Sequence, residues 1–242
     1  MLSATSFDRD GPLWRGLFGA RGFVSYRDLG GLTGAGLDAL IGRTIAHYAA
    51  ARVTSFEWKT RGHDAPPELP ERLIAHGFQA DEQETVMLGE AALLAVDVPL
   101  PPGVRLRRID DQSDPMPDVI RAAAAQKRAF GVPFGVDDLV RRLEKRRDLT
   151  EIWVAEAQGE VVCTGRLEVV PGTEFAGVWG GATVPEWRGR GIYRALTAAR
   201  AKSALRRDVR FLHSDSTEFS RPILQRSGLL PVTTTTPYLW TR

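Results

Sequence analysis

The sequence predicts an α/β (α+β) fold built as two halves, and three observations lead to this prediction. The second half holds a strand, a glycine-rich loop and a helix in direct succession between residues 175 and 200. Both halves end in the order strand, short helix, Gly-apolar pair and strand, which is typical of a duplicated unit. A proline-rich stretch at residues 97–103 separates the halves. We therefore expect one domain at residues 1–97, a semi-rigid linker at 98–103 and a second domain at 104–242.

The first half offers little regular pattern before Tyr26. Thr33 is a candidate N-cap for a helix over residues 34–52. The apolar face of that helix is formed by Leu37, Leu40, Ile41, Thr44, Ile45 and Tyr48. A strand over 53–58, a short helix over 68–76 and a strand over 85–88 complete this half.

Two patterns in the first half suggest chemistry but have simpler interpretations. Residues 31–36 show the spacing Gly-x-x-Gly-x-Gly, yet no arginine fills the first place and no clear buried strand precedes it, so we interpret this stretch as a helix entry. His63 and Asp64 are adjacent, and a turn that leads into the next helix explains both. We expect this half to pack against the second half.

The second half shows a regular alternation of strands and helices. It predicts a strand over 104–109, helices over 116–130 and 136–147, a hairpin of strands over 152–157 and 161–170, and a strand over 175–184. A helix from Ile192, a strand over 209–214, a helix over 220–226 and an extended tail over 237–240 follow. Cys163, the chain's single cysteine, falls inside a predicted strand, so we expect a buried thiol and no disulfide.

The loop Arg188-Gly189-Arg190-Gly191 lies between the strand and the helix that begins at Ile192. The first turn of a helix has unpaired N–H groups and the positive end of the helix dipole, so it favours an anion. Glycines let the main chain approach a bulky anion, and arginines add charge and forked donors. The loop therefore predicts a binding site for a pyrophosphate group.

The pattern Arg-x-x-Gly-x-Tyr from Arg188 to Tyr193, after a Val-Pro strand exit, resembles the acetyl-CoA-binding motif of the GNAT acyltransferase superfamily. Tyr193 stands where the family has a small residue. The resemblance implies acetyl-CoA as cofactor and a mixed, mostly antiparallel sheet with a bulged, splayed central strand flanked by helices. It also implies that the first half is a smaller, degenerate copy of the same fold.

The same resemblance assigns further residues to the cofactor. It implies that Thr183 and Val184 bind the pantetheine arm through their backbone, and that Thr217 and Ser220 lie beside it, Thr217 in a place where the family often has Asn. The tyrosine that usually protonates the leaving thiolate falls on Leu224, which leaves the acid open, and solvent is one alternative.

The general base is open among several residues. His213 and Asp215 are two apart on a predicted strand and share one face near the cofactor, so they are the first candidates. Glu186 is a further candidate, and Glu168 and Glu218 are alternatives.

Composition limits the classes of function. The chain has 242 residues and a formal net charge of +2. Residues 1–102 hold 9 basic and 13 acidic side chains, against 23 and 17 in the remainder, so the basic half contains the predicted phosphate loop. No apolar run is long enough to span a bilayer, and we expect a soluble, cytoplasmic monomer or homodimer that binds neither membrane nor metal.

We therefore expect an acetyl-CoA-dependent N-acetyltransferase that acts on an unidentified small-molecule or peptide amine. The alternative is a non-catalytic acyl-CoA-binding protein that kept the phosphate loop and lost the proton-transfer residues. A nucleic-acid binder is a third class, but the sequence lacks the stripe of alternating aromatic and basic residues that base stacking requires.

Overall fold

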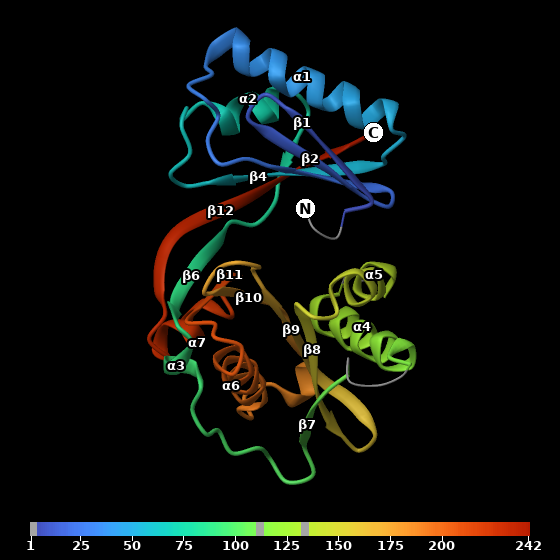
Figure 1. Cartoon of the computed structure of the whole chain (residues 1–242), viewed down its shortest axis with the longest axis vertical. Coiled ribbons are helices and arrows are strands. Elements are labelled where there is room, and N and C mark those ends of the chain that lie inside the picture. The colour runs from blue at the N-terminus through green and yellow to red at the C-terminus, as the bar shows by residue number, and fades with distance from the viewer. Residues whose placement is uncertain (1–3, 110–113, 132–135) are drawn as a thin grey trace. The chain divides into compact units, whose positions relative to one another are not determined.

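A computed structural model describes residues 4–109, 114–131 and 136–242 of the chain (Figure 1). The chain forms two compact units, Met1–Val86 with Thr233–Arg242, and Met87–Val232. The chain passes from the first unit to the second within strand β6 (Glu84–Glu90) and returns within strand β12 (Leu230–Thr241). Each unit has its own hydrophobic core.

These units differ from the predicted division at residues 97 and 104. Met87, Ala91 and Leu94 are buried with Leu212 and Leu229, so the end of β6 and helix α3 (Ala91–Leu94) belong to the second unit. The proline-rich stretch at 98–103 also lies within that unit. The last residues of the chain belong to the first unit, because β12 pairs with β4 from Thr235↔Arg61 to Thr241↔Ser55.

The first unit is a sheet with helices α1 (Gly34–Ala50) and α2 (Leu69–Ala75). Its strands are β1 (Ser6–Asp10), β2 (Leu13–Phe18), β3 (Arg21–Ser25), β4 (Ser55–Arg61) and β5 (Gln79–Ala80), with parts of β6 and β12. The strands β1, β2 and β3 form an antiparallel meander, and β3 then pairs in parallel with β4 through the crossover helix α1. The predicted apolar face of α1 is confirmed, with Leu37, Leu40, Ile41, Thr44 and Tyr48 buried.

The second unit has the element order that the sequence predicts. It contains the strands β7 (Arg105–Arg108), β8 (Thr150–Ala157), β9 (Glu160–Val169), β10 (Phe175–Thr183) and β11 (Phe211–Ser216). Its helices are α4 (Met116–Phe130), α5 (Val136–Arg146), α6 (Ile192–Leu205) and α7 (Arg221–Arg226), with a 3-10 turn at Pro185–Trp187. The strands β7 to β10 pair antiparallel in sequence order, and β10 pairs in parallel with β11.

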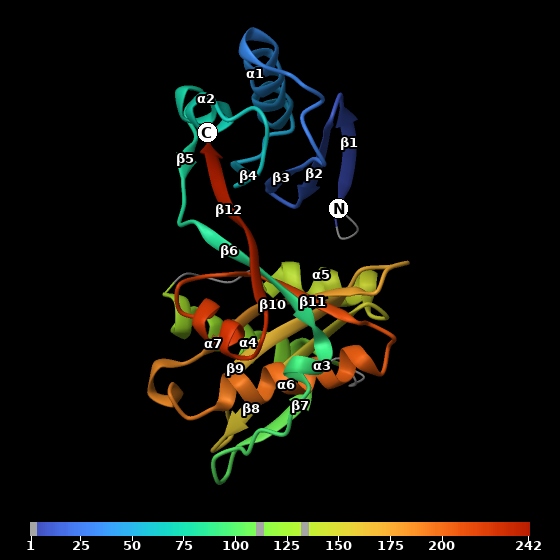
Figure 2. The same ribbon diagram turned by 90° about the vertical axis from the view of Figure 1, so that its left-hand side faces the viewer.

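The helices of the second unit cover both faces of its sheet. Helices α4 and α5 lie on one face of β8 and β9, and α6 lies on the other (Figure 1). Figure 2 shows α6 and α7 together in front of these strands. We call the first side the α4/α5 face and the second the α6/α7 face.

Candidate functional site

The sheet of the second unit opens between β10 and β11. Within these fully described strands, β10 pairs with β11 only from Phe175↔Phe211 to Gly177↔His213, although both strands run on. On its other side β10 has a bulge against β9 between Trp179 and Ala182, and Gly180 within it has φ 59°. Such a bulge bends a strand and increases its twist. The predicted bulged and splayed central strand is therefore confirmed.

Gln126 of α4 holds this bulge in place from the α4/α5 face. Its Nε2 donates to the Gly180 carbonyl oxygen at 2.8 Å, and the residue is 2% exposed. The Oε1 atom is buried and has no hydrogen-bond partner among the described residues. Gln126 could not be predicted from the sequence, because a single glutamine on an amphipathic helix carries no local signal of a contact 54 residues away.

The main chain at the end of β10 presents one N–H group to the opening. Val184 donates its N–H to Val162 of β9 at 3.0 Å. Alternate residues of a strand direct their N–H groups to opposite neighbours, so the Thr183 N–H points away from β9, toward the opening. Of the two residues predicted to bind pantetheine by their backbone, Thr183 fits this role, whereas the Val184 N–H is used inside the sheet.

The glycine loop enters α6 through two residues with left-handed backbone. Gly189 has φ 74° and Gly191 has φ 79°, and a Cβ atom built on either would have no other atom within 4 Å. No acceptor among the described residues takes the N–H groups of Ile192, Tyr193 and Arg194, and α6 has no acidic residue in its first turn. The loop therefore combines open space with unpaired donors at the positive end of a 14-residue helix.

The two arginines of the loop make different contacts. Arg188 donates through Nε to the Thr183 carbonyl at 3.1 Å and through Nη2 to the Ala129 carbonyl at 2.8 Å, so it ties the loop to β10 and to the end of α4. Two of its guanidinium nitrogens are therefore engaged within the protein, and Arg188 stays a predicted phosphate ligand only through its remaining donors. Arg190 is exposed, with its guanidinium 4.7 Å from the Trp187 ring centroid, and it remains a candidate phosphate ligand.

Tyr193 stands where the family motif has a small residue, and its ring fits there because it packs against a glycine. A Cβ atom on Gly181 would lie 2.6 Å from Cε2 of Tyr193, so the ring lies directly against the bulge on the α6/α7 face. Burial raises the pKa of Tyr193, which keeps the phenol neutral. The ring and the glycine therefore form a complementary pair, and the backbone of the loop keeps its bend.

His213 lies on the α4/α5 face beside the opening. Its ring packs edge-on against the Trp179 ring, with 5.1 Å between the ring centroids. Burial lowers the pKa of His213, while Asp215 and Glu168 act to raise it. The imidazole is therefore neutral near pH 7 and has a nitrogen that can accept a proton, and Asp215 follows it on the same face. The pair His213 and Asp215 stays the first candidate for the base, and Trp179, which packs against His213, carries no signal in the sequence.

The carboxylates proposed as alternative bases are engaged elsewhere. Glu186 pairs with Arg128 on the surface, and contacts with its own backbone and with Arg128 lower its pKa, which makes it a weak base. Glu168 accepts from Arg166 at 3.1 Å and from Arg142 at 3.3 Å. Glu218 pairs with Arg221 at 3.1 Å. Each of the three therefore has a cationic partner, and Glu168 also lies near His213, since both residues pair with Gly177. Glu186 stays a candidate base whose lowered pKa weakens it.

The predicted residues after β11 form a turn at the start of α7. The Thr217 carbonyl accepts from the Ser220 N–H at 3.1 Å and from the Arg221 N–H at 2.9 Å. Leu224, at the family's tyrosine position, is 1% exposed and packs in the core with Leu212. Thr217 and Ser220 therefore lie at the open end of β11, and their contact with the cofactor stays a prediction.

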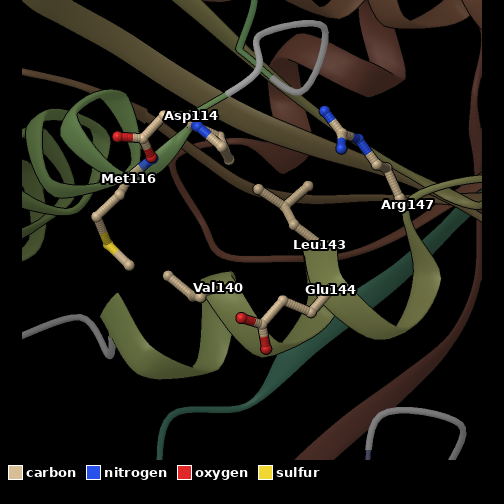
Figure 3. Close-up of a pocket in the computed structure, with 7 residues that line it drawn as sticks. Asp114, Met116, Val140, Leu143, Glu144 and Arg147 are labelled. Atoms are coloured by element: carbon tan, nitrogen blue, oxygen red, sulfur yellow. The ribbon is translucent and has the colours of Figure 1, made fainter.

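A pocket of about 260 Å³ lies elsewhere, between the start of α4 and α5 (Figure 3). It is lined by Asp114, Pro115, Met116, Val140, Leu143, Glu144 and Arg147. Met116 is ten residues before Gln126 on α4, which corresponds to about 15 Å along the helix. This pocket is therefore separate from the opening between β10 and β11.

The first unit repeats the strand–helix–strand topology of the site, but different residues stand at the start of its helix. There β3, α1 and β4 stand in the relation of β10, α6 and β11. The carboxylate of Glu68 accepts from the Gly34 N–H at 3.4 Å at the start of α1. Asp64 accepts from the Tyr26 hydroxyl at 2.5 Å and from the Arg61 N–H at 2.6 Å, so it is bound in a turn and is no partner for His63. A carboxylate at the helix start repels a phosphate, which supports a structural role for the glycines at 31–36.

Comparison with known proteins gives the class of fold. No family model matches the sequence, and no curated protein matches it. The structure matches a GCN5-related N-acetyltransferase from Kribbella flavida with a TM-score of 0.70 and 16% identity over 97% of this chain and 89% of that one. It also matches one from Sphaerobacter thermophilus with a TM-score of 0.64 and 18% identity over 95% and 76% of the two chains.

A third match is a tandem GNAT protein from the clavulanic acid biosynthesis pathway, with a TM-score of 0.64 and 15% identity over 95% and 78% of the two chains. The chain therefore has the fold of the GCN5-related N-acetyltransferases. Separately, no helix in the described part of the chain has the length and apolar character to cross a lipid bilayer.

Cys163 provides a test of the core beneath the site. The predicted burial is confirmed, since the residue is 0% exposed and its Sγ accepts from the Thr183 hydroxyl at 3.1 Å. Burial raises the pKa of the thiol to about 11, so thiolate is scarce at neutral pH. We expect the native protein to show no reaction with an aromatic disulfide reagent at pH 8, and unfolding to release one thiol per chain. Rapid labelling of the native protein would contradict this packing.

Proposed function

We propose that the chain is an N-acetyltransferase that uses acetyl-CoA as donor and transfers the acetyl group to a primary amine. The observation that carries the proposal is the open, glycine-lined start of α6 directly after a bulged strand that parts from its neighbour. The turn from Gly189 to Arg194 fits a pyrophosphate because its N–H groups have no acceptor in the described part of the chain. The Thr183 N–H fits an amide or carbonyl oxygen of the pantetheine arm.

The two faces of the sheet then have separate roles. When bound, acetyl-CoA supplies the thioester carbonyl that an amine attacks directly, without a covalent enzyme intermediate. Helix α6 binds the donor on the α6/α7 face. Neutral His213 accepts a proton from the attacking nitrogen on the α4/α5 face, and Asp215 and Glu168 stabilise the imidazolium that forms. Gln126 keeps the bulge in the shape that joins the two faces.

The test measures CoA binding by calorimetry and free thiol release from acetyl-CoA with a panel of small amines and peptides with free amino ends. We expect micromolar to submillimolar CoA binding and thiol release with a subset of the amines. Absence of CoA binding would refute the donor site. One observation favours a non-catalytic acyl-CoA-binding protein, namely Leu224 at the family's tyrosine position. CoA binding without thiol release on any amine would support that alternative.

We expect one CoA per chain despite the repeated topology. The first unit has the carboxylate of Glu68 at the start of α1, whereas α6 has no acidic residue in its first turn. Calorimetry should therefore give a stoichiometry of one. A value of two would show that the first unit also binds the cofactor.

A further inference from the structure

Ser216 has a buried hydroxyl at the opening of the sheet. It is the last residue of β11 and lies in the part of that strand that has left β10. The residue is 1% exposed, and its Oγ has no hydrogen-bond partner among the described residues. An unsatisfied buried hydroxyl costs free energy, so a specific unpaired group of this kind calls for a ligand or another explanation.

The direction of the Ser216 side chain follows from the register of β11. Leu212 packs with Ala201 of α6 and Leu224 of α7, so it points to the α6/α7 face. Side chains alternate along a strand, and Ser214 and Ser216 therefore share that face, while His213 and Asp215 point to the other. Ser216 thus lies on the side of the proposed donor and of Leu224.

Other hydroxyls on the α6/α7 side are already engaged. Ser214 Oγ donates to the Asp215 carbonyl at 3.3 Å, and Thr197 Oγ1 donates to the Tyr193 carbonyl at 2.8 Å. The Thr183 hydroxyl donates to the Cys163 sulfur at 3.1 Å. Leu224 has no group that can donate. Unlike these three hydroxyls, the Ser216 hydroxyl has no partner among the described residues, so it is free to donate to a ligand atom in the opening.

We propose that Ser216 donates a hydrogen bond to the sulfur of the bound cofactor and stabilises the thiolate that leaves. This proposal rests on the proposed donor site at α6. In the transfer, the amine nitrogen forms the C–N bond, the C–S bond breaks, and its electron pair stays on sulfur. His213 receives the proton of the nitrogen. Ser216 keeps its own proton and shares it with the thiolate, which solvent protonates after release.

The test compares Ser216→Ala with the wild type by using CoA and desulfo-CoA, which lacks the thiol. A hydrogen bond to a charged group contributes more than one to a neutral group, so the thiol of bound CoA should have a lower pKa in the wild type. We expect the pKa of the bound thiol, followed by the ultraviolet absorbance of the thiolate, to rise by about one unit in Ser216→Ala, which corresponds to a tenfold loss of thiolate affinity. Affinity for desulfo-CoA should stay within about twofold.

Ser214→Ala is the matched control, because Ser214 is on the same strand and face but donates to a carbonyl. It should leave the pKa of the bound thiol unchanged. An equal pKa in the wild type and Ser216→Ala, or an equal loss of affinity for CoA and desulfo-CoA in Ser216→Ala, would overturn the role of Ser216 alone. Failure of the wild type to bind either ligand would overturn the donor site together with this proposal.

Discussion

Gly191→Val should lower the affinity for CoA at least about a hundredfold while the protein stays folded. Gly191 has φ 79°, and a side chain there has open space in the protein, so the valine would project where the proposed pyrophosphate lies. A β-branched residue also disfavours this backbone conformation, and the turn would move its N–H groups away from the ligand. Loss of two charge-assisted hydrogen bonds, at about 1.5–3 kcal/mol each, gives a factor of this size. Calorimetry with CoA measures it.

Gly172→Val is the matched control for this substitution. Gly172 has φ 71° and equally open space, but it lies in the turn between β9 and β10. Both variants place valine in a left-handed conformation that costs about 1–2 kcal/mol, which a typical domain stability of about 5–15 kcal/mol tolerates. We expect similar melting temperatures and normal CoA affinity in Gly172→Val. Normal CoA affinity in Gly191→Val would refute the phosphate site.

Local sequence patterns were sufficient to predict the elements of the fold that form the phosphate loop. The loop from Arg188 to Gly191 and the helix from Ile192 follow from glycines, charge and apolar periodicity within one short stretch, and the structure has both. The apolar face of α1 follows from the same periodicity. These features depend on neighbours in sequence, so they can be recognised without the fold.

The strands before Tyr26 were not predicted because they lack a clear alternation. β1 carries Phe7 with 59% exposure, and β2 begins with a buried Leu13 followed by Trp14 at 41% exposure. Pairing between neighbouring strands stabilises them more than local propensity does. For the same reason the division of the chain was missed, since β12 pairs with β4 across about 180 positions of sequence.

The site also contains residues whose roles depend on contacts that no sequence motif specifies. Arg188 matches the motif, yet its guanidinium turns inward to the carbonyls of Thr183 and Ala129. Gln126 and Trp179 match no motif, and their positions follow from the bulge in β10. The motif therefore indicates the side of the proposed donor site, whereas the side of the proposed acceptor depends on the packing of α4 and α5 against the sheet.

His213→Gln should lower kcat/KM for the amine by about a hundredfold near pH 8 and leave CoA affinity unchanged. A general base contributes about 10²–10⁴ to a rate, and glutamine keeps the size and polarity of the side chain without a basic nitrogen. His213 points to the face opposite Leu212, which packs against α6, so the donor site should be intact. Initial rates of thiol release and calorimetry measure the two effects separately.

The dependence of the rate on pH also tests His213 as the general base, because the direction of the change can be predicted. Burial lowers the pKa of His213 below its ordinary value of about 6.5, so the neutral base persists into mildly acidic solution, and the rate should fall only as the pH drops through this lowered pKa. That acidic limb should be absent from His213→Gln. Asp215 acts to raise the pKa of His213, so Asp215→Asn should move the limb to lower pH. If His213→Gln keeps the rate and its fall at acidic pH, another group is the base. If the fall occurs at the same pH in Asp215→Asn, Asp215 does not influence the pKa of His213.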